Sequence, residues 1–519
     1  MRCGAAALVV ALVFAAPAGA AGPPLRVSMN ADIRGLDPGV NRDDNTDTVI
    51  HHIVETLIAY RADLSIGPLL ADRWTIEDDG RTYRFELRRG LRFHNGAPVT
   101  SAEVRWSWQR YLDPATNWSC RSWFDGSSDS GGGVTIESIE APDPHTVVFR
   151  LDRANVLFLA QLANIQCPPA VLHPDSIGPD GAWREPVATG PYRLQEWRRG
   201  QYVELVRFPG YRPRAEPRSA YAGARVAHEE RLRFVVVPEA VAAIAALRGG
   251  SLDVVDRVSA DALAELERDP KVRLHHQPLL GWTVLLVNTR DPLLSDIRLR
   301  RALAHVIQRD RIVQVNTGRL ASVNSSVVPV SSAYRTPVHD LWYPYDLAKA
   351  RELVRASGYR DQPIRIQTNR RFKNMFDNAI VIQAMLHSIG IRAELDVMDW
   401  ASQLARYQAG RFQLSSFSYT GRLDPAFSYG ALIGNRDERG TAQWEDPQAA
   451  ALFASLLVQE NPAERSGTME ALHRRMVEQL PIIGLYNGHS AIATHADIQG
   501  LEPWAPGTLY LWGVSRTRR

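Results

Sequence analysis

From about residue 230 onward, segments typical of buried strands alternate with segments typical of helices, and this alternation constrains the fold more than any other feature. The run "LRFVVV" (232–237) is typical of a buried strand, "EAVAAIAALRGG" (239–250) of a helix that ends on glycines, and "LDVVDRV" (252–258) of the next strand. Parallel strands need such crossover connections, and the helices then cover the faces of the sheet. The alternation therefore predicts an α/β fold with a mainly parallel sheet.

The same alternation continues through the second half of the chain. "WTVLLVNT" (282–289), "IRIQT" (364–368) and "IRAELDV" (391–397) are typical of strands. Between them, Asp296 and Asp346 stand where helix N-caps are expected. At 519 residues the chain is long enough for two or three packed units, so this order predicts two α/β lobes.

An antiparallel elaboration is expected before residue 190. Residues 83–87 alternate apolar with charged side chains, which is the period of a strand with one buried face. Asn95-Gly96 is a strong turn pair, and Thr100 precedes Glu103 at the spacing of a capping box, which predicts a helix.

The region 189–229 follows this elaboration. Its first part, "TGPYRLQEWRRGQYVELVRF" (189–208), predicts a hairpin that turns at Arg199-Gly200. Residues 209–229 are rich in Pro, Arg and Ala, and we expect them to form an exposed excursion.

The first twenty residues have the features of a cleaved export signal. Arg2 precedes the apolar run "AAALVVALVFAA" (5–16), and Ala18-Gly19-Ala20 gives a small-x-small cleavage pattern. The apolar run is too short to be a stable membrane anchor. We therefore expect residues 1–20 to be a signal peptide and the mature protein to be soluble and periplasmic.

Removal of that signal leaves two cysteines, Cys120 and Cys167, in an oxidising compartment. A disulfide between them is one hypothesis, and closing a loop of that length stabilises by about 3–4 kcal/mol in the chain-entropy model. Two buried thiols are the alternative.

The sequence offers no recognisable catalytic, metal or nucleic-acid site. The net charge of +3 does not suggest a nucleic-acid binder, and G-x-S-x-G, H-E-x-x-H and paired C-x-x-C motifs are absent. His51-His52 and His275-His276 lack further ligands at metal-binding spacing, and the acidic run 41–47 lacks the glycine and terminal glutamate of a calcium loop. We therefore expect no catalytic residue, metal or cofactor. For an exported α/β protein of two lobes, the lack of such residues favours a binding function over catalysis.

Several long motifs, in order along nearly the whole chain, carry a family resemblance. They are "LDP" (36–38), "PLLADRW" (68–74), "LRRGLRFHNGAPVTSAEVRWSWQRYLDP" (87–114), "ATGPYRLQEWRRG" (188–200), "DIRLRRALAHVIQRDRIV" (296–313) and "YDLAKARELVRASGY" (345–359). Together they resemble the large peptide-type periplasmic solute-binding proteins of ABC importers, the extracellular solute-binding family 5, which also includes binders of nickel chelates, glutathione, opines and sugars. Ala188 departs from the glycine usual in this family.

The resemblance implies a class II periplasmic binding protein fold of the large peptide-binding type. Lobe I would cover residues 21–280, with an extra α+β subdomain at about 60–185. Lobe II would cover 281–482, and residues 483–519 would return to lobe I. Two crossing strands would join the lobes, and a ligand would be buried between them.

Peptide binders of this family hold the ligand's amino terminus with an aspartate four residues before a proline. In the matching segment "FQLSSFSYTGRLDP" (412–425) this position is Gly421, which departs from the pattern. Asp424 could substitute, or the ligand has no free amine. In the same loop, Tyr419 offers an aromatic face and Arg422 a guanidinium suited to a carboxylate.

Four further residues complete the candidate ligand-binding set. Arg371-Phe372 lies where many relatives place an Arg-Tyr pair, and an arginine there can hold an anionic ligand end. Trp400 and Trp282 are candidate walls of lobe II. Core packing is the alternative for each aromatic residue, a surface salt bridge for Arg371 and Arg422, and a turn cap for Asp424.

We therefore expect a monomeric substrate-binding component that delivers a small polar solute to an ABC permease with its ATPase subunits, touching the membrane complex only peripherally. An oligopeptide or modified peptide is the first candidate ligand, and an opine-like or other carboxylated solute is the second. A nickel chelate is less favoured because 412–425 contains no histidine. Rival interpretations are an exported hydrolase with an unrecognised site and a chaperone or signalling receptor with the same fold.

Overall fold

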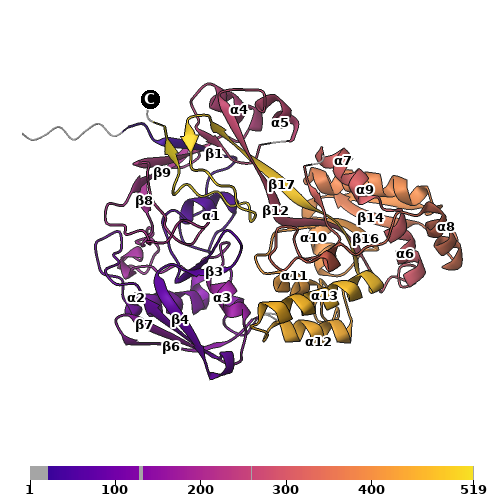
Figure 1. Ribbon diagram of the computed structural model, residues 1–519, viewed down its shortest axis with the longest axis horizontal. Helices are drawn as coiled ribbons and strands as arrows, with labels where there is room; N and C mark the ends of the chain where they lie inside the picture. The colour runs from indigo at the N-terminus through magenta and orange to yellow at the C-terminus, as the bar shows by residue number, and fades with distance from the viewer. Residues whose placement is uncertain (1–21, 128–132, 259, 319, 518–519) are drawn as a thin grey trace, which may run out of the picture.

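A single mixed sheet runs through both halves of the molecule (Figure 1). The computed structural model describes residues 22–127, 133–258, 260–318 and 320–517. Across the sheet the strands are β15 (Ala393–Met398), β14 (Ile364–Asn369), β16 (Leu414–Tyr419), β12 (Val272–Val287), β17 (Ile482–His495), β11 (Val254–Val255), β1 (Leu25–Met29), β10 (Arg231–Val236), β9 (Tyr202–Arg207) and β8 (Tyr192–Arg198). A short strand, β13 (Ser322–Val323), pairs with β17. We call the half that contains β1 the first lobe and the half that contains β14 the second lobe.

The predicted α/β fold class is confirmed, but the sheet is mixed rather than mainly parallel. Parallel pairs occur within each lobe, where β1 pairs with β10 and β11, and β14 pairs with β15 and β16. The long strands β12 and β17 pair antiparallel between the lobes. The predicted hairpin, β8 and β9 with Gly200 at its turn, adds a further antiparallel pair at one edge.

The first lobe also contains a separate four-stranded antiparallel sheet. Its strands, in order, are β4 (Ala71–Glu77), β5 (Thr82–Leu87), β7 (Thr146–Leu151) and β6 (Ile136–Asp143). Beside it lies α2 (Ser101–Leu112), whose N-cap Thr100 forms a capping box with Glu103. The strand and the capped helix predicted for this stretch are therefore confirmed.

The other elements of the first lobe are short. They are α1 (Asp44–Ile50), β2 (Ile58–Tyr60), β3 (Ile66–Pro68), α3 (Leu157–Leu162), α4 (Ala240–Arg248), α5 (Ala260–Leu266), β18 (Ile498–Gln499) and β19 (Ser515–Arg516). One large core fills this lobe. It includes Trp504 and Trp512 from the C-terminal segment.

The second lobe is mainly helical around its part of the sheet. Its helices are α6 (Ile297–Val306), α7 (Arg309–Thr317), α8 (Leu347–Ala356), α9 (Lys373–His387), α10 (Trp400–Gln408), α11 (Pro425–Leu432), α12 (Pro447–Leu456) and α13 (Pro462–Gln479). Asp296 caps α6 and Asp346 caps α8, as predicted from the sequence.

The chain passes between the lobes in β12 and β17 (Figure 1). A further contact between the lobes is formed where the Val156 amide donates a hydrogen bond of 2.9 Å to the Leu457 carbonyl. There, Leu157 packs into a hydrophobic cluster of the second lobe. The lobe boundaries 280/281 and 482/483 stay predictions, and the predicted signal peptide lies outside the described residues.

The prediction that residues 209–229 form an exposed excursion fits residues 209–217, which are mostly exposed, but is wrong for residues 220–225, which are mostly buried. Tyr221 is 1% exposed and Arg225 is 2% exposed. The Arg225 guanidinium donates hydrogen bonds to the Tyr221 carbonyl and lies 4.6 Å from the centre of the Trp512 ring. The sequence pattern missed this because the covering residues come from the C-terminal segment, almost three hundred positions away.

Candidate ligand-binding site

A cavity of about 780 Å³ lies between the two lobes. The first lobe contributes acidic, amide and aromatic side chains, and the second contributes aromatic residues and arginines. The cavity lining includes Asp44, Asp47, Tyr60, Trp123, Asn164, Gln166 and Arg257 from the first lobe, and Trp400, Tyr407, Phe417, Tyr419, Gly421, Arg422 and Phe427 from the second. A cavity of this size and mixed lining suits a small organic ligand.

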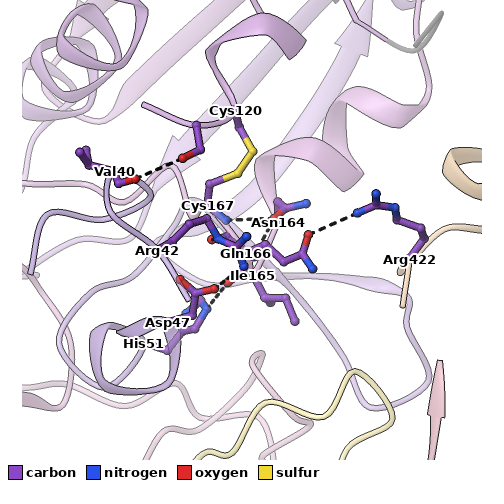
Figure 2. The surroundings of a disulfide bond; sticks show 11 residues. Val40, Arg42, Asp47, His51, Cys120, Asn164, Ile165, Gln166, Cys167 and Arg422 are labelled. Carbon is purple, nitrogen blue, oxygen red and sulfur yellow. Dashed lines mark hydrogen bonds and ion pairs between the residues drawn. A yellow bond between two sulfur atoms is a disulfide. The ribbon is translucent and has the colours of Figure 1, made fainter. Parts of the chain in front are cut away.

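Arg422 is a charged residue of the second lobe that lines this cavity. It follows β16 and extends toward the first lobe, where one of its guanidinium nitrogens donates a hydrogen bond of 3.4 Å to Gln166 Oε1 (Figure 2). Protein surrounds most of the side chain, and this burial lowers the pKa of Arg422. Among the described residues, no carboxylate forms an ion pair with it.

Two tyrosines stand beside Arg422 on the second-lobe wall. The hydroxyl groups of Tyr407 and Tyr419 share a hydrogen bond of 3.1 Å. Tyr419 stacks on Trp282, with ring centroids 5.1 Å apart. Trp282 is 4% exposed and does not line the cavity, so it supports Tyr419 from behind.

Trp400 lines the cavity and also a neighbouring hollow of about 530 Å³. Arg371 borders that second hollow, and the Phe372 ring meets Trp400 edge-on at 4.9 Å. Neither Arg371 nor Phe372 lines the main cavity. The structure therefore brings Trp400, Tyr419 and Arg422 together at the cavity and places Arg371 and Phe372 on the far side of Trp400.

Asp424 has structural partners for both carboxylate oxygens. Oδ1 accepts a hydrogen bond of 2.8 Å from the Ala426 amide, as the N-cap of α11, and Oδ2 pairs with Arg465 at 2.8 Å. It does not line the cavity. The geometry of Asp424 therefore matches the turn-cap alternative and not a ligand contact.

Gly421 is packed against the crossing strand β12. A Cβ atom at this position would lie 2.6 Å from Leu280 Cβ and 3.1 Å from the Gly281 nitrogen. Both contacts are closer than ordinary van der Waals packing, so an aspartate does not fit here without movement of the loop. Steric packing therefore accounts for the absence of the amine-holding aspartate.

The first-lobe wall contains charged residues that sequence reasoning did not assign to the site. Asp44 pairs with Arg257 at 2.9 Å, and Asp47 pairs with Arg42 at 2.5 Å. Burial outweighs the effect of Arg42 and raises the pKa of Asp47 to about 7. The sequence feature that could have indicated Asp44 and Asp47 is the acidic run 41–47, which suggests only a calcium loop when read by itself. Trp123 and Gln166 gave no signal in the sequence.

The predicted disulfide between Cys120 and Cys167 is present, with the two Cα atoms 6.2 Å apart (Figure 2). Both cysteines are buried beside the first-lobe wall. Within residues 22–127, 133–258, 260–318 and 320–517, no group of three or more His, Cys, Asp or Glu side chains could hold a metal ion. Among those same residues, none of the helices has the length and hydropathy needed to cross a bilayer.

Curated relatives cover most of the chain. The glutathione-binding protein GsiB of Escherichia coli (strain K12) is 26% identical over 504 residues, which is 93% of each protein. Heme-binding protein A of Haemophilus influenzae is 26% identical over 428 residues, covering 77% of this chain and 75% of the relative.

Solved structures share the fold. HbpA2 from Haemophilus parasuis aligns with a TM-score of 0.81 and 22% identity over 96% of this chain and 100% of that one. AgaA from A. tumefacien R10, solved in complex with agropinic acid, aligns with a TM-score of 0.73 and 23% identity over 96% and 99%.

A family model agrees with these similarities. The model described as "Bacterial extracellular solute-binding proteins, family 5 Middle" matches residues 65–439. This match covers more than two thirds of the chain and confirms the resemblance that the sequence motifs carried. The chain therefore belongs to family 5 of the bacterial extracellular solute-binding proteins, the substrate-binding components of ABC importers.

Proposed function

We propose that this protein binds a small carboxylated solute between its two lobes in the periplasm and delivers it, chemically unchanged, to an ABC permease driven by ATPase subunits. A ligand that contacts both lobes favours the closed arrangement by its differential affinity for that arrangement. The permease would then recognise the closed form.

The observation that carries this proposal is Arg422. Its guanidinium lines the cavity and donates a hydrogen bond to Gln166 of the opposite lobe. A buried charge without a counter-charge is costly, and a ligand carboxylate would remove that cost through charge-assisted hydrogen bonds. The acidic groups of the opposite wall do not fill this role, because Asp44 is paired with Arg257 and Asp47 with Arg42.

The ligand class follows from this charge and from Gly421. The tight packing of Gly421 against Leu280 removes the family's usual acidic partner for a peptide amine. Two relatives are named for ligands that suit such a site: the glutathione-binding protein GsiB, and AgaA solved with agropinic acid. A modified peptide or an opine with at least one free carboxylate is therefore the class that we favour.

An ordinary oligopeptide with a free amine is the second candidate. Asp44 and Asp47 line the first-lobe wall and supply carboxylate oxygens that an ammonium group could approach. This mode would have to compete with the arginines that already pair with them.

Isothermal titration calorimetry with matched probes tests the proposal. Glutathione and agropinic acid are the first carboxylated probes, glutathione diethyl ester is the control that lacks a free carboxylate, and trialanine with N-acetyl-trialanine tests the need for an amine. We expect binding of at least one carboxylated probe and loss of binding on esterification. Binding of the ester with undiminished affinity would contradict the carboxylate assignment. Binding of trialanine but not of its acetylated form would show that an amine is needed and would favour the oligopeptide candidate.

Mass spectrometry of the same mixtures separates carriage from hydrolysis. Recovery of the intact probe after prolonged incubation supports a binding protein. Recovery of cleaved fragments would favour the exported-hydrolase interpretation instead.

A further inference from the structure

Three separate segments of the first lobe meet at the Cys120–Cys167 disulfide, and each contributes to the cavity wall. Cys120 lies three residues before Trp123, and Cys167 directly follows Gln166. The third segment, residues 39–47, carries Asp44 and Asp47. Figure 2 shows the second and third segments together with the sulfur bridge and Arg422, which reaches in from the second lobe.

The segment around Cys120 has its own anchor in the core. Trp118 and Phe124 stack with ring centroids 5.7 Å apart, and both pack edge-on against Trp108 of α2. All three side chains are at most 3% exposed. This aromatic cluster holds residues 118–124 in place independently of the sulfur bridge.

The position of the segment that contains Cys167 depends more on individual hydrogen bonds. The Asn164 side chain accepts hydrogen bonds from the backbone amides of Gln166 and Cys167, at 2.7 and 3.2 Å. Nε2 of His51 donates to the Ile165 carbonyl at 2.6 Å. The disulfide adds the covalent link that fixes residues 164–167 to the anchored segment 118–124.

Residues 39–47 pack directly on this link. The Ser119 amide donates to the Gly39 carbonyl at 3.0 Å, and the Arg42 guanidinium donates to the Gln166 carbonyl. Gly39 has a φ of +75°, and a Cβ there would lie 2.9 Å from Cys167 Cβ. The three segments therefore form one close-packed unit, which we call the disulfide brace (residues 39–47, 118–124 and 164–167).

The brace provides two first-lobe side chains that touch the second lobe, one at Phe427 of α11 and one at Arg422. Trp123 stacks on Phe427 with ring centroids 6.0 Å apart and an interplanar angle of 16°. Gln166 accepts the hydrogen bond from Arg422. One of these contacts comes from each side of the sulfur bridge.

We propose that the Cys120–Cys167 disulfide is a positioning element of the binding site. It holds Gln166, and with it the first-lobe wall, in the arrangement that meets Arg422 and Phe427 around the bound solute. Removing it therefore weakens solute binding while the first lobe stays folded. This inference rests on the proposed function of the same cavity.

The test compares three proteins: wild type, the double variant Cys120→Ala/Cys167→Ala, and Val203→Ala as a destabilised control. Val203 is fully buried in β9, which does not line the cavity. Glutathione and agropinic acid are the calorimetric probes, at a temperature well below every melting transition. We expect the double variant to bind at least tenfold more weakly than wild type, and Val203→Ala to bind within about twofold of wild type.

Amide hydrogen exchange provides a readout that does not need a bound probe. In the double variant, we expect faster exchange in peptides that cover residues 164–167, with little change in second-lobe peptides. If wild type binds neither probe, the proposed ligand class fails and the exchange data alone decide the positioning role.

Three results would overturn the positioning role. The first is unchanged probe affinity in the double variant. The second is an equal loss of affinity in the double variant and in Val203→Ala. The third is exchange that is unchanged, or faster to the same degree throughout the first lobe.

Discussion

The charged groups on the two walls of the cavity are compensated in different ways. On the first-lobe wall, Asp44 and Asp47 are each matched by an arginine of the same lobe. On the second-lobe wall, Arg422 donates a hydrogen bond to a side-chain amide oxygen of the other lobe.

This difference indicates a division of labour. The charges of the first-lobe wall are already compensated within a lobe that a disulfide links together. An ionic ligand would therefore add little favourable electrostatic energy there. The wall with an uncompensated guanidinium gains most when a ligand supplies the counter-charge. Ligand charge should therefore be recognised by the second lobe, and the first lobe should determine shape and closure.

The largest expected effect comes from removing the uncompensated charge. Arg422→Ala should weaken binding of a carboxylated probe by about 2–5 kcal/mol, the range for a desolvated charge pair. It should not lower the stability of the unliganded protein, because it removes a cation without an ion-pair partner. Calorimetry and thermal unfolding check the two parts.

A matched control for Arg422→Ala is Arg298→Ala. Arg298 is an arginine of the same lobe with 51% of its side chain exposed, paired with Asp296. It should leave affinity unchanged. Arg422→Ala with wild-type affinity would remove the proposed difference between the two walls.

Acid should destabilise the first lobe. His52 donates from Nδ1 to the Thr48 carbonyl and accepts at Nε2 from the Leu511 amide, so its ring is neutral in the fold. Burial lowers the pKa of His52 to about 4. The unfolded chain takes up this proton first as the pH falls, so stability is lost between about pH 6.5 and about pH 4, by up to about 3 kcal/mol.

Urea unfolding at several pH values measures this loss. His52→Gln should flatten the acid dependence, because an amide can keep one donor and one acceptor without charging. His228→Gln, at an exposed position of the same lobe, should leave the pH profile as in wild type. If the free energy of unfolding of His52→Gln depended on pH as steeply as that of wild type, His52 would not be the group that makes the first lobe sensitive to acid.

The next effect concerns the loop that carries Arg422. Gly421→Ala places a Cβ at 2.6 Å from Leu280 Cβ, and overpacking of this kind costs about 1–3 kcal/mol. Thermal unfolding should show the loss, and affinity for a carboxylated probe should fall because Arg422 is the next residue.

A second glycine provides the reference for this substitution. Gly467 is an exposed position inside α13, and a Cβ there meets no atom within 4 Å. Gly467→Ala should therefore stabilise the protein by about 0.5–1 kcal/mol. Stability changes of the same sign in the two variants would contradict the packing assigned to Gly421.

The smallest effect is expected from Gln166→Ala. Its hydrogen bond with Arg422 is long, at 3.4 Å, so its loss should cost about 1 kcal/mol of affinity or less. The same titration used for Arg422→Ala measures it. A loss as large as that of Arg422→Ala would mean that the first lobe also recognises the ligand's charge.

Local patterns predicted the elements well because their causes are local. The capping box of Thr100 and Glu103, the caps Asp296 and Asp346, and the turn at Gly200 all depend on neighbouring residues. The position of Trp400, Tyr419 and Arg422 at the cavity followed from family motifs rather than from periodicity.

The other half of the site could not be predicted in this way. Asp47, Trp123 and Gln166 converge from three distant segments, and no periodic pattern records that convergence. The length of β12 and the burial of Arg225 also depend on partners far along the chain, β17 and the C-terminal segment. Such tertiary contacts decide burial and pairing where local preference is weak.

Native mass spectrometry of protein purified without refolding tests the central claim most directly. The account predicts an added mass in wild type that corresponds to a small solute with at least one free carboxylate, released unaltered on denaturation. The same mass should be absent or strongly reduced in Arg422→Ala. An uncharged or purely cationic solute, a cleaved one, or equal retention by Arg422→Ala would contradict the account.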